Sequence, residues 1–256
     1  MPIAVLLAQF PVSLSIQSNI ETMRAVLEQT RTGDLVVFPE GSISGYSTDV
    51  SFLERIQHQE LRAGLSLLQT EAKRREITIW SGAYIKDDSR WYNAAYGFTP
   101  GSKTYIYHKI NLATHERGIF LAGIDLPVFE LDTPTGAVVV GIQMCRELRF
   151  PEQWRSLSRR GAQVILHLNN AIGDDRYQSV WRSHLISRAA ETQRFVISVN
   201  NADPKQICPT MAIAPDGQVM EEIVSNRLKL LRVELDLSKV SNWYLDQSRI
   251  DIIAIN

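Results

Sequence analysis

The sequence has few cysteines, no long apolar run and no excess of charge. Only Cys145 and Cys208 occur among its 256 residues, which argues against a disulfide framework and favours the reducing cytoplasm. The first apolar segment, residues 3–10, is too short to cross a bilayer and shows neither a basic leader nor a cleavage site, so we expect no membrane association. Basic and acidic residues nearly balance at a net charge of -1, which does not favour a nucleic-acid partner.

Motifs for several common chemistries are also missing. The five histidines do not show metal-ligand spacing, and there is neither a phosphate-binding loop nor a dinucleotide fingerprint. The loop after Glu40 resembles a nucleophile elbow, but the residue midway between Gly41 and Gly45 is Ile43 instead of serine. We therefore expect neither a metal nor a cofactor, and no serine hydrolase.

Short apolar runs of strand length alternate with amphipathic segments of helical period. Strands are expected at 3–10, 35–38, 77–85, 91–100, 103–109, 136–144, 164–168, 195–200, 211–214, 218–224 and 228–237. Helices are expected at 20–30, 61–75, 152–160 and 177–193, the first one capped by Ser18 with Glu21. Two mixed sheets packed face to face with helices outside bury all these runs. The sequence thus predicts an α/β protein with a four-layer α-β-β-α sandwich, formed by one domain over residues 1–256.

Three chemically useful side chains each follow directly after a predicted strand: Glu40, Lys109 and Cys145. If these strand ends lie on one edge, a thiol, a carboxylate base and a cation share one cleft, as acyl transfer by cysteine requires. The carboxylate can accept the thiol proton and the ammonium can stabilise an oxyanion. The plain alternatives are a buried core thiol, a capping or surface carboxylate and a solvated lysine.

The segments VVFPEGSISGY, YHKINL with HERGIFLAG, and CRELRFPEQWR resemble the nitrilase superfamily of carbon-nitrogen hydrolases. The resemblance implies the same four-layer sandwich, no metal, and usually a homodimer. It implies that Glu40 is the general base, Lys109 the oxyanion stabiliser and Cys145 the nucleophile. Glu116, which is followed by Phe120 and Gly123 at the family's spacing, matches a second glutamate that orients Lys109 or the substrate nitrogen.

The chain departs from the superfamily directly after the nucleophile. Arg146 and Glu147 stand where an aromatic residue and often an aspartate are usual. Arg146 is therefore a candidate substrate-binding residue, either favouring the thiolate or recognising a substrate carboxylate. The alternative is an ion pair with Glu147 or Glu152.

Two further residues are candidates for substrate binding. Asn170 follows a predicted strand, beside Asn169, and could contact a polar substrate, although asparagines there also form turns. Tyr46 lies in the loop after Glu40. Trp181 and Cys208 are expected to be structural.

The predicted function is hydrolysis of a small-molecule amide to a carboxylic acid and ammonia through a cysteine thioester. Nitriles and N-carbamoyl compounds are alternative substrates, and a catalytically weak ligand-binding module is the alternative of another class. We expect a homodimer or a higher homo-oligomer. The apolar tail, residues 241–256, either packs at that interface or forms an edge strand within the monomer.

Overall fold

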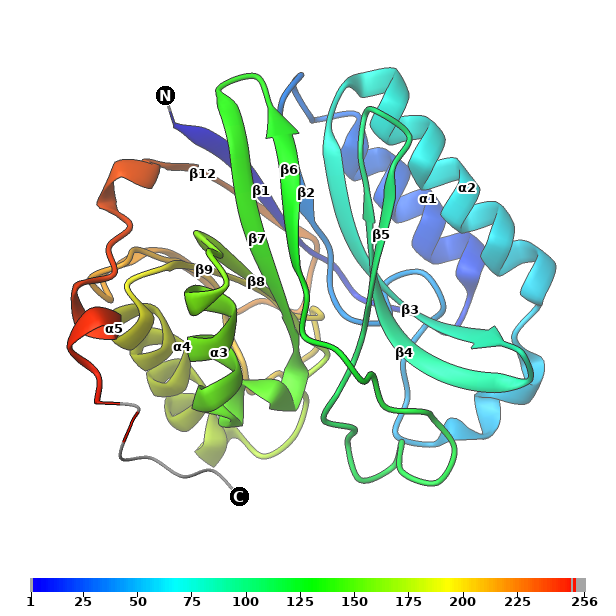
Figure 1. Ribbon diagram of the computed structural model, residues 1–256. Helices are drawn as coiled ribbons and strands as arrows, with labels where there is room; N and C mark the ends of the chain where they lie inside the picture. The colour runs from blue at the N-terminus through cyan, green and yellow to red at the C-terminus, as the bar shows by residue number, and fades with distance from the viewer. Residues whose placement is uncertain (1, 250, 252–256) are drawn as a thin grey trace.

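Two six-stranded sheets face each other in the computed structural model, which describes residues 2–249 and residue 251 (Figure 1). The first sheet contains, in spatial order, β12 (Lys229–Leu235), β1 (Ile3–Gln9), β2 (Leu35–Val37), β3 (Thr78–Asp87), β4 (Arg90–Phe98) and β5 (Thr104–His108). The second contains β11 (Val219–Ile223), β10 (Thr210–Ile213), β9 (Phe195–Val199), β8 (Val164–Leu168), β7 (Gly136–Met144) and β6 (Val128–Thr133).

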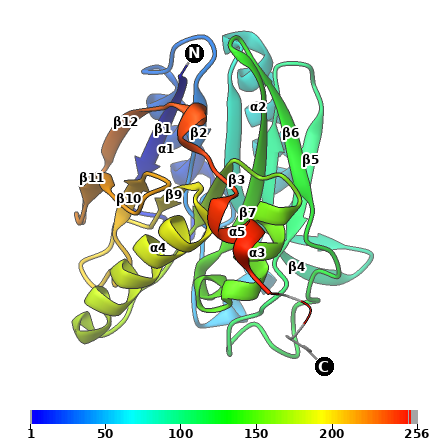
Figure 2. The same cartoon turned by 60° about the vertical axis from the view of Figure 1, so that its left-hand side comes forward.

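Helices cover the outer face of each sheet. The first sheet carries α1 (Ile16–Leu27) and α2 (His58–Arg75), and the second carries α3 (Pro151–Arg159) and α4 (Gln178–Thr192) (Figure 1). The short helix α5 (Trp243–Gln247) lies beside α3 and α4 (Figure 2). Short 3-10 turns occur at Val50–Arg55, Cys145–Arg149, Asp175–Tyr177 and Leu237–Lys239. The predicted four-layer α-β-β-α sandwich is confirmed.

Three apolar layers separate the four structural layers, because side chains alternate between the two faces of a strand. In β1, Val5 and Leu7 join the layer between the sheets, whereas Leu6 and Ala8 face α1 and α2. In the second sheet, Ile165 belongs to the layer beneath α3 and α4. Both faces of these strands are therefore buried, which explains why their sequences are mainly apolar and do not alternate with polar residues.

The two sheets share one strand pattern, although no sequence repeat is recognisable. Each has three central parallel strands, β1-β2-β3 and β7-β8-β9, flanked by antiparallel strands. The carboxyl ends of β2 and β8 meet at one end of the sandwich, where the N–H of Glu40 donates to the main-chain oxygen of Asn169 over 3.1 Å. The residues that follow these strands therefore gather at that end.

Three details differ from the sequence-based expectation. The first helix begins a turn earlier than predicted, at Ile16, because its capping residue is Ser15 and not Ser18. The hydroxyl of Ser15 accepts the main-chain N–H of Ser18, which lies in the first turn of the helix. The edge strand β6 was not predicted, since every second residue of this short segment is polar or exposed. In the tail, residues 243–247 form α5 instead of an edge strand, and residues 250 and 252–256 lie outside the described residues.

None of the helices that the structure describes is long and apolar enough to cross a membrane.

Candidate active site

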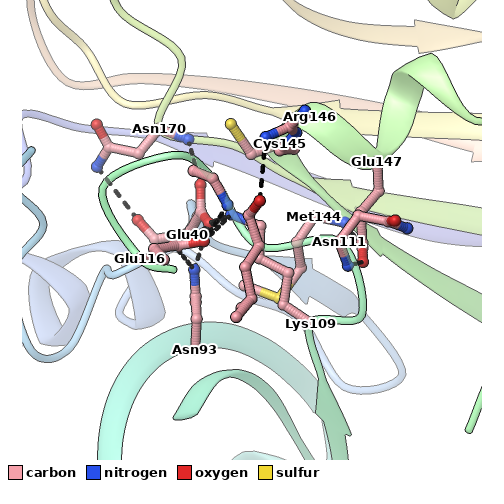
Figure 3. A network of polar contacts seen from close by, with 12 residues as sticks. Glu40, Asn93, Lys109, Asn111, Glu116, Met144, Cys145, Arg146, Glu147 and Asn170 are labelled. Atoms are coloured by element: carbon pink, nitrogen blue, oxygen red, sulfur yellow. Dashed lines mark hydrogen bonds and ion pairs between the residues drawn. The ribbon is translucent and has the colours of Figure 1, made fainter. Parts of the chain in front are cut away.

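Glu40 lies at the centre of a buried polar cluster at the end of β2 (Figure 3). One carboxylate oxygen, Oε1, accepts hydrogen bonds from the amide of Asn93 at 2.7 Å and from Nζ of Lys109 at 2.8 Å. The other, Oε2, accepts the main-chain N–H of Asn170 at 3.1 Å. The side chain is fully buried, so these donors fix its orientation.

The loop that carries Glu40 rests directly on β3, and a glycine makes this approach possible. A Cβ atom at Gly82 would lie 2.5 Å from the nitrogen of Gly41 and 2.6 Å from Cα of Glu40. The hydroxyl of Ser44 accepts the N–H of Tyr84 at 2.8 Å and fastens the loop to the same strand. The position of the carboxylate thus depends on a close contact between two main chains.

Lys109, directly after β5, connects two carboxylates. Its ammonium lies 2.8 Å from Glu40 and 3.1 Å from Glu116, and all three side chains are fully buried. Gly123 allows the chain to pass closely here: its N–H donates to the main-chain oxygen of Lys109 at 2.9 Å, and a Cβ would lie 2.2 Å from the oxygen of His108. The lysine is therefore held from both its side chain and its main chain.

Asn93, in the middle of β4, belongs to the site and was missed by sequence reasoning. Its amide donates to Glu40 at 2.7 Å and to Glu116 at 2.6 Å. The only signal in the sequence was a single amide within the otherwise apolar and aromatic run of residues 91–98. Such a group requires buried partners.

Burial and nearby charges shift the pKa values of Glu40 and Glu116 in opposite directions. Burial raises the pKa of Glu40 above its ordinary value and outweighs the attraction of Lys109. Burial also acts to raise the pKa of Glu116, but Lys109 and the N–H of Ala113 lower it overall. Burial acts to lower the pKa of Lys109, but the charges of Glu40 and Glu116 raise it overall. Glu40 is thus the better proton acceptor, beside an ionised Glu116 and a permanently charged Lys109.

Cys145 directly follows β7 and begins a 3-10 turn, with a backbone φ of +47° that residues other than glycine rarely adopt. Its main-chain oxygen lies 2.8 Å from Nε2 of His167, and because a carbonyl only accepts, that nitrogen carries the proton. Burial and then the charge of Glu40 raise the pKa of the Cys145 thiol well above its ordinary value. The resting group is a thiol, so attack by this sulfur requires a base.

Glu147 is a structural link between two catalytic candidates. Its carboxylate accepts the N–H groups of Ile110 at 2.8 Å and Asn111 at 2.9 Å, which directly follow Lys109. It also accepts the N–H of Met144 at 2.7 Å, directly before Cys145. Figure 3 shows Glu147 beside Met144 and Asn111. The glutamate therefore connects the Lys109 loop to the turn that begins at Cys145.

Arg146 does not form the ion pairs considered from the sequence. Its guanidinium donates from Nη1 to the main-chain oxygen of Leu112 at 3.0 Å. Glu147 is occupied by main-chain donors and the hydroxyl of Tyr107. The interpretation of Arg146 as a partner of Glu147 or Glu152 is wrong, because no such pair occurs among the described residues.

A cavity of about 410 Å³ opens onto Cys145. Its walls include Tyr46, Arg146, Asn170 and Trp181. Trp181 is buried in the core as expected, yet it also forms part of this wall.

Asn170 also braces the site, because its amide donates to the main-chain oxygen of Glu40 at 3.2 Å and accepts from Asn201 at 3.0 Å. A larger hollow of about 820 Å³, around Asp34 and Glu76, begins at the opposite end of β2 and contains none of the three triad candidates.

The amino-acid sequence is similar to a family of known proteins and to individual members with stated activities. The family model described as carbon-nitrogen hydrolase matches residues 4–244. The chain is 30% identical over 241 residues to a 2-oxoglutaramate amidase of Bacillus subtilis (strain 168), covering 90% of each chain. It is 28% identical over 224 residues to an (R)-stereoselective amidase of Pseudomonas sp, covering 86% of this chain and 79% of the relative.

Among solved structures, one similar fold is a variant of the amidase from Nesterenkonia sp. AN1. It matches with a TM-score of 0.81 and 22% identity, covering 98% of this chain and 95% of the other. That structure carries the acetamide moiety of fluoroacetamide covalently added at its active site cysteine.

Proposed function

Because the chain belongs to the carbon-nitrogen hydrolase family, we propose that it hydrolyses a small amide to a carboxylic acid and ammonia through a thioester on Cys145. The observation that carries this proposal is the buried cluster of Glu40, Lys109 and Glu116 at the strand ends beside the Cys145 cavity. A thiol with a raised pKa beside a carboxylate with a raised pKa suits proton transfer within the pair.

In the acylation half, Glu40 takes the proton of the Cys145 thiol while the sulfur attacks the amide carbon. Lys109 and the main-chain N–H of Arg146 stabilise the negative oxygen of the tetrahedral intermediate. The carbon–nitrogen bond then breaks, Glu40 returns its proton to the leaving nitrogen, and ammonia departs. The acyl group remains on sulfur as a thioester.

In the deacylation half, Glu40 takes a proton from water, and the resulting hydroxide adds to the thioester carbon. The carbon–sulfur bond breaks, the acid leaves, and the sulfur regains its proton. Glu116 takes no proton in either half. It holds Lys109 in place, because its lowered pKa keeps it ionised.

Tyr46 and Asn170 belong to the proposal as walls of the substrate cavity. The side-chain oxygen of Asn170 accepts a hydrogen bond from Asn201. The main-chain N–H of Asn170 holds the carboxylate of Glu40, which is a second contribution of this residue to the site. Residues 1–256 are proposed to form one domain, since the two sheets share the core between them.

A homo-oligomer and a cytoplasmic location are further parts of the proposal. Cys145 and Cys208 are free thiols, which suits a reducing compartment. Trp243 and Tyr244 on α5 expose 58% and 51% of their surface, which suits a partner surface. Sedimentation of the intact protein and of a Trp243→Ser/Tyr244→Ser variant tests this: a dimer that dissociates in the variant supports the interface, and a monomer in both contradicts it.

The central test uses intact-mass spectrometry with butyramide and fluoroacetamide. We expect ammonia release from butyramide, and an adduct with fluoroacetamide on the wild type and on Cys208→Ala but not on Cys145→Ala. Full turnover by Cys145→Ala would refute the thioester. A folded wild-type protein that is inert on amides but releases ammonia from nitriles or N-carbamoyl compounds would support the alternative substrates, and one inert on all would support a binding module.

A further inference from the structure

We propose, on the premise of the amidase function above, that the preferred amides carry a carboxylate group, and that the guanidinium of Arg146 binds it. The substrate class is a monoamide of a dicarboxylic acid. Arg146 lines the same cavity as Cys145 and follows it directly in the chain, so a group bound there lies beside the reacting carbon. Figure 3 shows the two side chains next to each other.

The guanidinium of Arg146 is incompletely satisfied. It is half-buried, its Nη1 donates to the main-chain oxygen of Leu112, and its Nε is buried without a hydrogen-bond partner. Among the described residues, no ion pair includes Arg146 or Arg149. A cation withdrawn from water without a counter-charge is costly, so an anionic ligand gains by supplying one.

Arg149 adds a second cation at the rim of this cavity. It is exposed, and its guanidinium carbon lies 5.6 Å from the ring centre of Trp181. The guanidinium of Arg146 lies 6.0 Å from the ring centre of Phe150 in a similar way. Aromatic faces restrict the orientation of both groups and do not neutralise them.

The remaining walls do not offset this charge. The cavity is lined by Tyr46, Thr48, Ala113, Thr114, His115, Cys145, Arg146, Arg149, Asn170, Ala171, Ile172, Trp181 and Ile207. This set contains two arginines and neither aspartate nor glutamate. Glu40 and Glu116 are not part of this lining, and both pair with Lys109. The entrance therefore favours an anion, and the planar fork of an arginine fits a carboxylate in particular.

An alternative role for Arg146 is to stabilise the Cys145 thiolate. That role would benefit every amide equally, whereas recognition of a carboxylate benefits only the charged substrates. Succinamate and butyramide separate the two roles, because they differ only in a terminal carboxylate against a methyl group. The readout is the ratio of kcat/KM for succinamate to that for butyramide.

We expect this ratio to exceed about 10 in the wild type and to fall to about 1 in Arg146→Gln, mainly through KM for succinamate. Arg146→Lys should lie between them, and Arg149→Gln should lower the ratio about 2- to 5-fold because this residue is exposed. Arg24→Gln, an exposed arginine on α1, is the matched control and should keep the wild-type ratio. A wild-type ratio near 1, or an equal loss on both substrates in Arg146→Gln, would overturn the proposal.

Calorimetric binding of succinamate to the Cys145→Ala protein separates this inference from the amidase proposal. We expect binding that weakens about 10- to 100-fold when Arg146→Gln is added. If the wild type hydrolyses butyramide but the affinity of the Cys145→Ala protein for succinamate is unchanged by Arg146→Gln, only this inference fails. If neither amide is hydrolysed by the folded wild type, the amidase proposal fails, and with it the substrate class proposed here.

Discussion

His167 holds the main chain of Cys145 in place: its Nε2 donates to the main-chain oxygen of Cys145 over 2.8 Å. The opposite nitrogen, Nδ1, accepts from the amide of Asn169 at 2.8 Å and lies 3.2 Å from the hydroxyl of Ser198. Because Cys145 has a positive φ, an external hydrogen bond that fixes its carbonyl helps to maintain the strained turn. A neutral, correctly oriented imidazole is thus part of the support of the site.

This relationship predicts an acid-sensitive stability. Burial lowers the pKa of His167 to about 4, whereas its ordinary value is 6.5. The unfolded chain therefore takes up this proton first, and stability is lost as the pH falls from about 6.5 to about 4, by on the order of 3 kcal/mol.

Urea unfolding at pH 7 and pH 4.5 checks this, with His167→Gln as the comparison. A glutamine does not titrate but can donate to the same carbonyl, so the free energy of unfolding of this variant should fall less between pH 7 and pH 4.5 than that of the wild type. His184→Gln, at a half-buried position on α4, is the control and should keep most of the wild-type loss. Equal losses in the wild type and His167→Gln would contradict the assignment.

Glu147→Gln should impair catalysis without removing any triad residue. One amide cannot accept from all the N–H groups that the carboxylate serves, and its own NH₂ faces donors instead of acceptors. We expect kcat to fall about 10- to 100-fold, since the Lys109 loop and the Cys145 turn lose their link. The exposed Glu152→Gln, on α3, is the control.

Steady-state rates with one amide, together with thermal unfolding, separate positioning from global damage. A loss of kcat with KM retained, and with Tm lowered by a few degrees at most, fits a positioning role. Wild-type kcat in Glu147→Gln would show that the link is dispensable.

Lys109→Met should be strongly destabilising and inactive. It leaves Glu40 and Glu116 buried without their counter-charge, and breaking such a buried pair costs about 3–5 kcal/mol. The double variant Lys109→Met/Glu116→Gln removes one of the stranded charges, so it should recover part of the free energy of unfolding but no turnover. Chemical denaturation measures the first effect and ammonia release the second.

The exposed Lys73→Met at the end of α2 serves as the control for the lost lysine. If the double variant is no more stable than the single one, the two carboxylates do not share the charge of Lys109 as the geometry indicates.

Gly82→Ala should reduce activity about 100-fold, because one added methyl group displaces the loop that carries Glu40. The Cβ would meet the Gly41 nitrogen at 2.5 Å, a main-chain atom that cannot rotate away. Gly101→Ala is the control, since a Cβ there has nothing within 4 Å. Kinetics with butyramide decide the outcome: similar rates for both variants would show that the contact does not set the position of Glu40.

Most elements of the fold could be predicted from local patterns. The runs at β8 and β9 are apolar except for His167 and Ser198, because both faces of these strands are buried, and Pro151 begins α3 as a first-turn proline should. The edge strand β6 was missed because an edge strand needs only one apolar face, so its pattern is weak.

The sequence by itself determined that Glu40, Lys109 and Cys145 each follow a strand, because strand ends are encoded locally by the change from apolar to polar residues. Which strand ends meet depends on sheet order and on contacts between distant segments. Only the tertiary structure decided that Asn93 bridges two carboxylates, that Glu147 connects Lys109 to Cys145, and that Arg146 lacks an ionic partner within the part of the chain that the structure describes. Partners 53, 23 and 37 residues apart along the chain leave no local pattern, since burial and charge compensation arise only once the chain has closed around them.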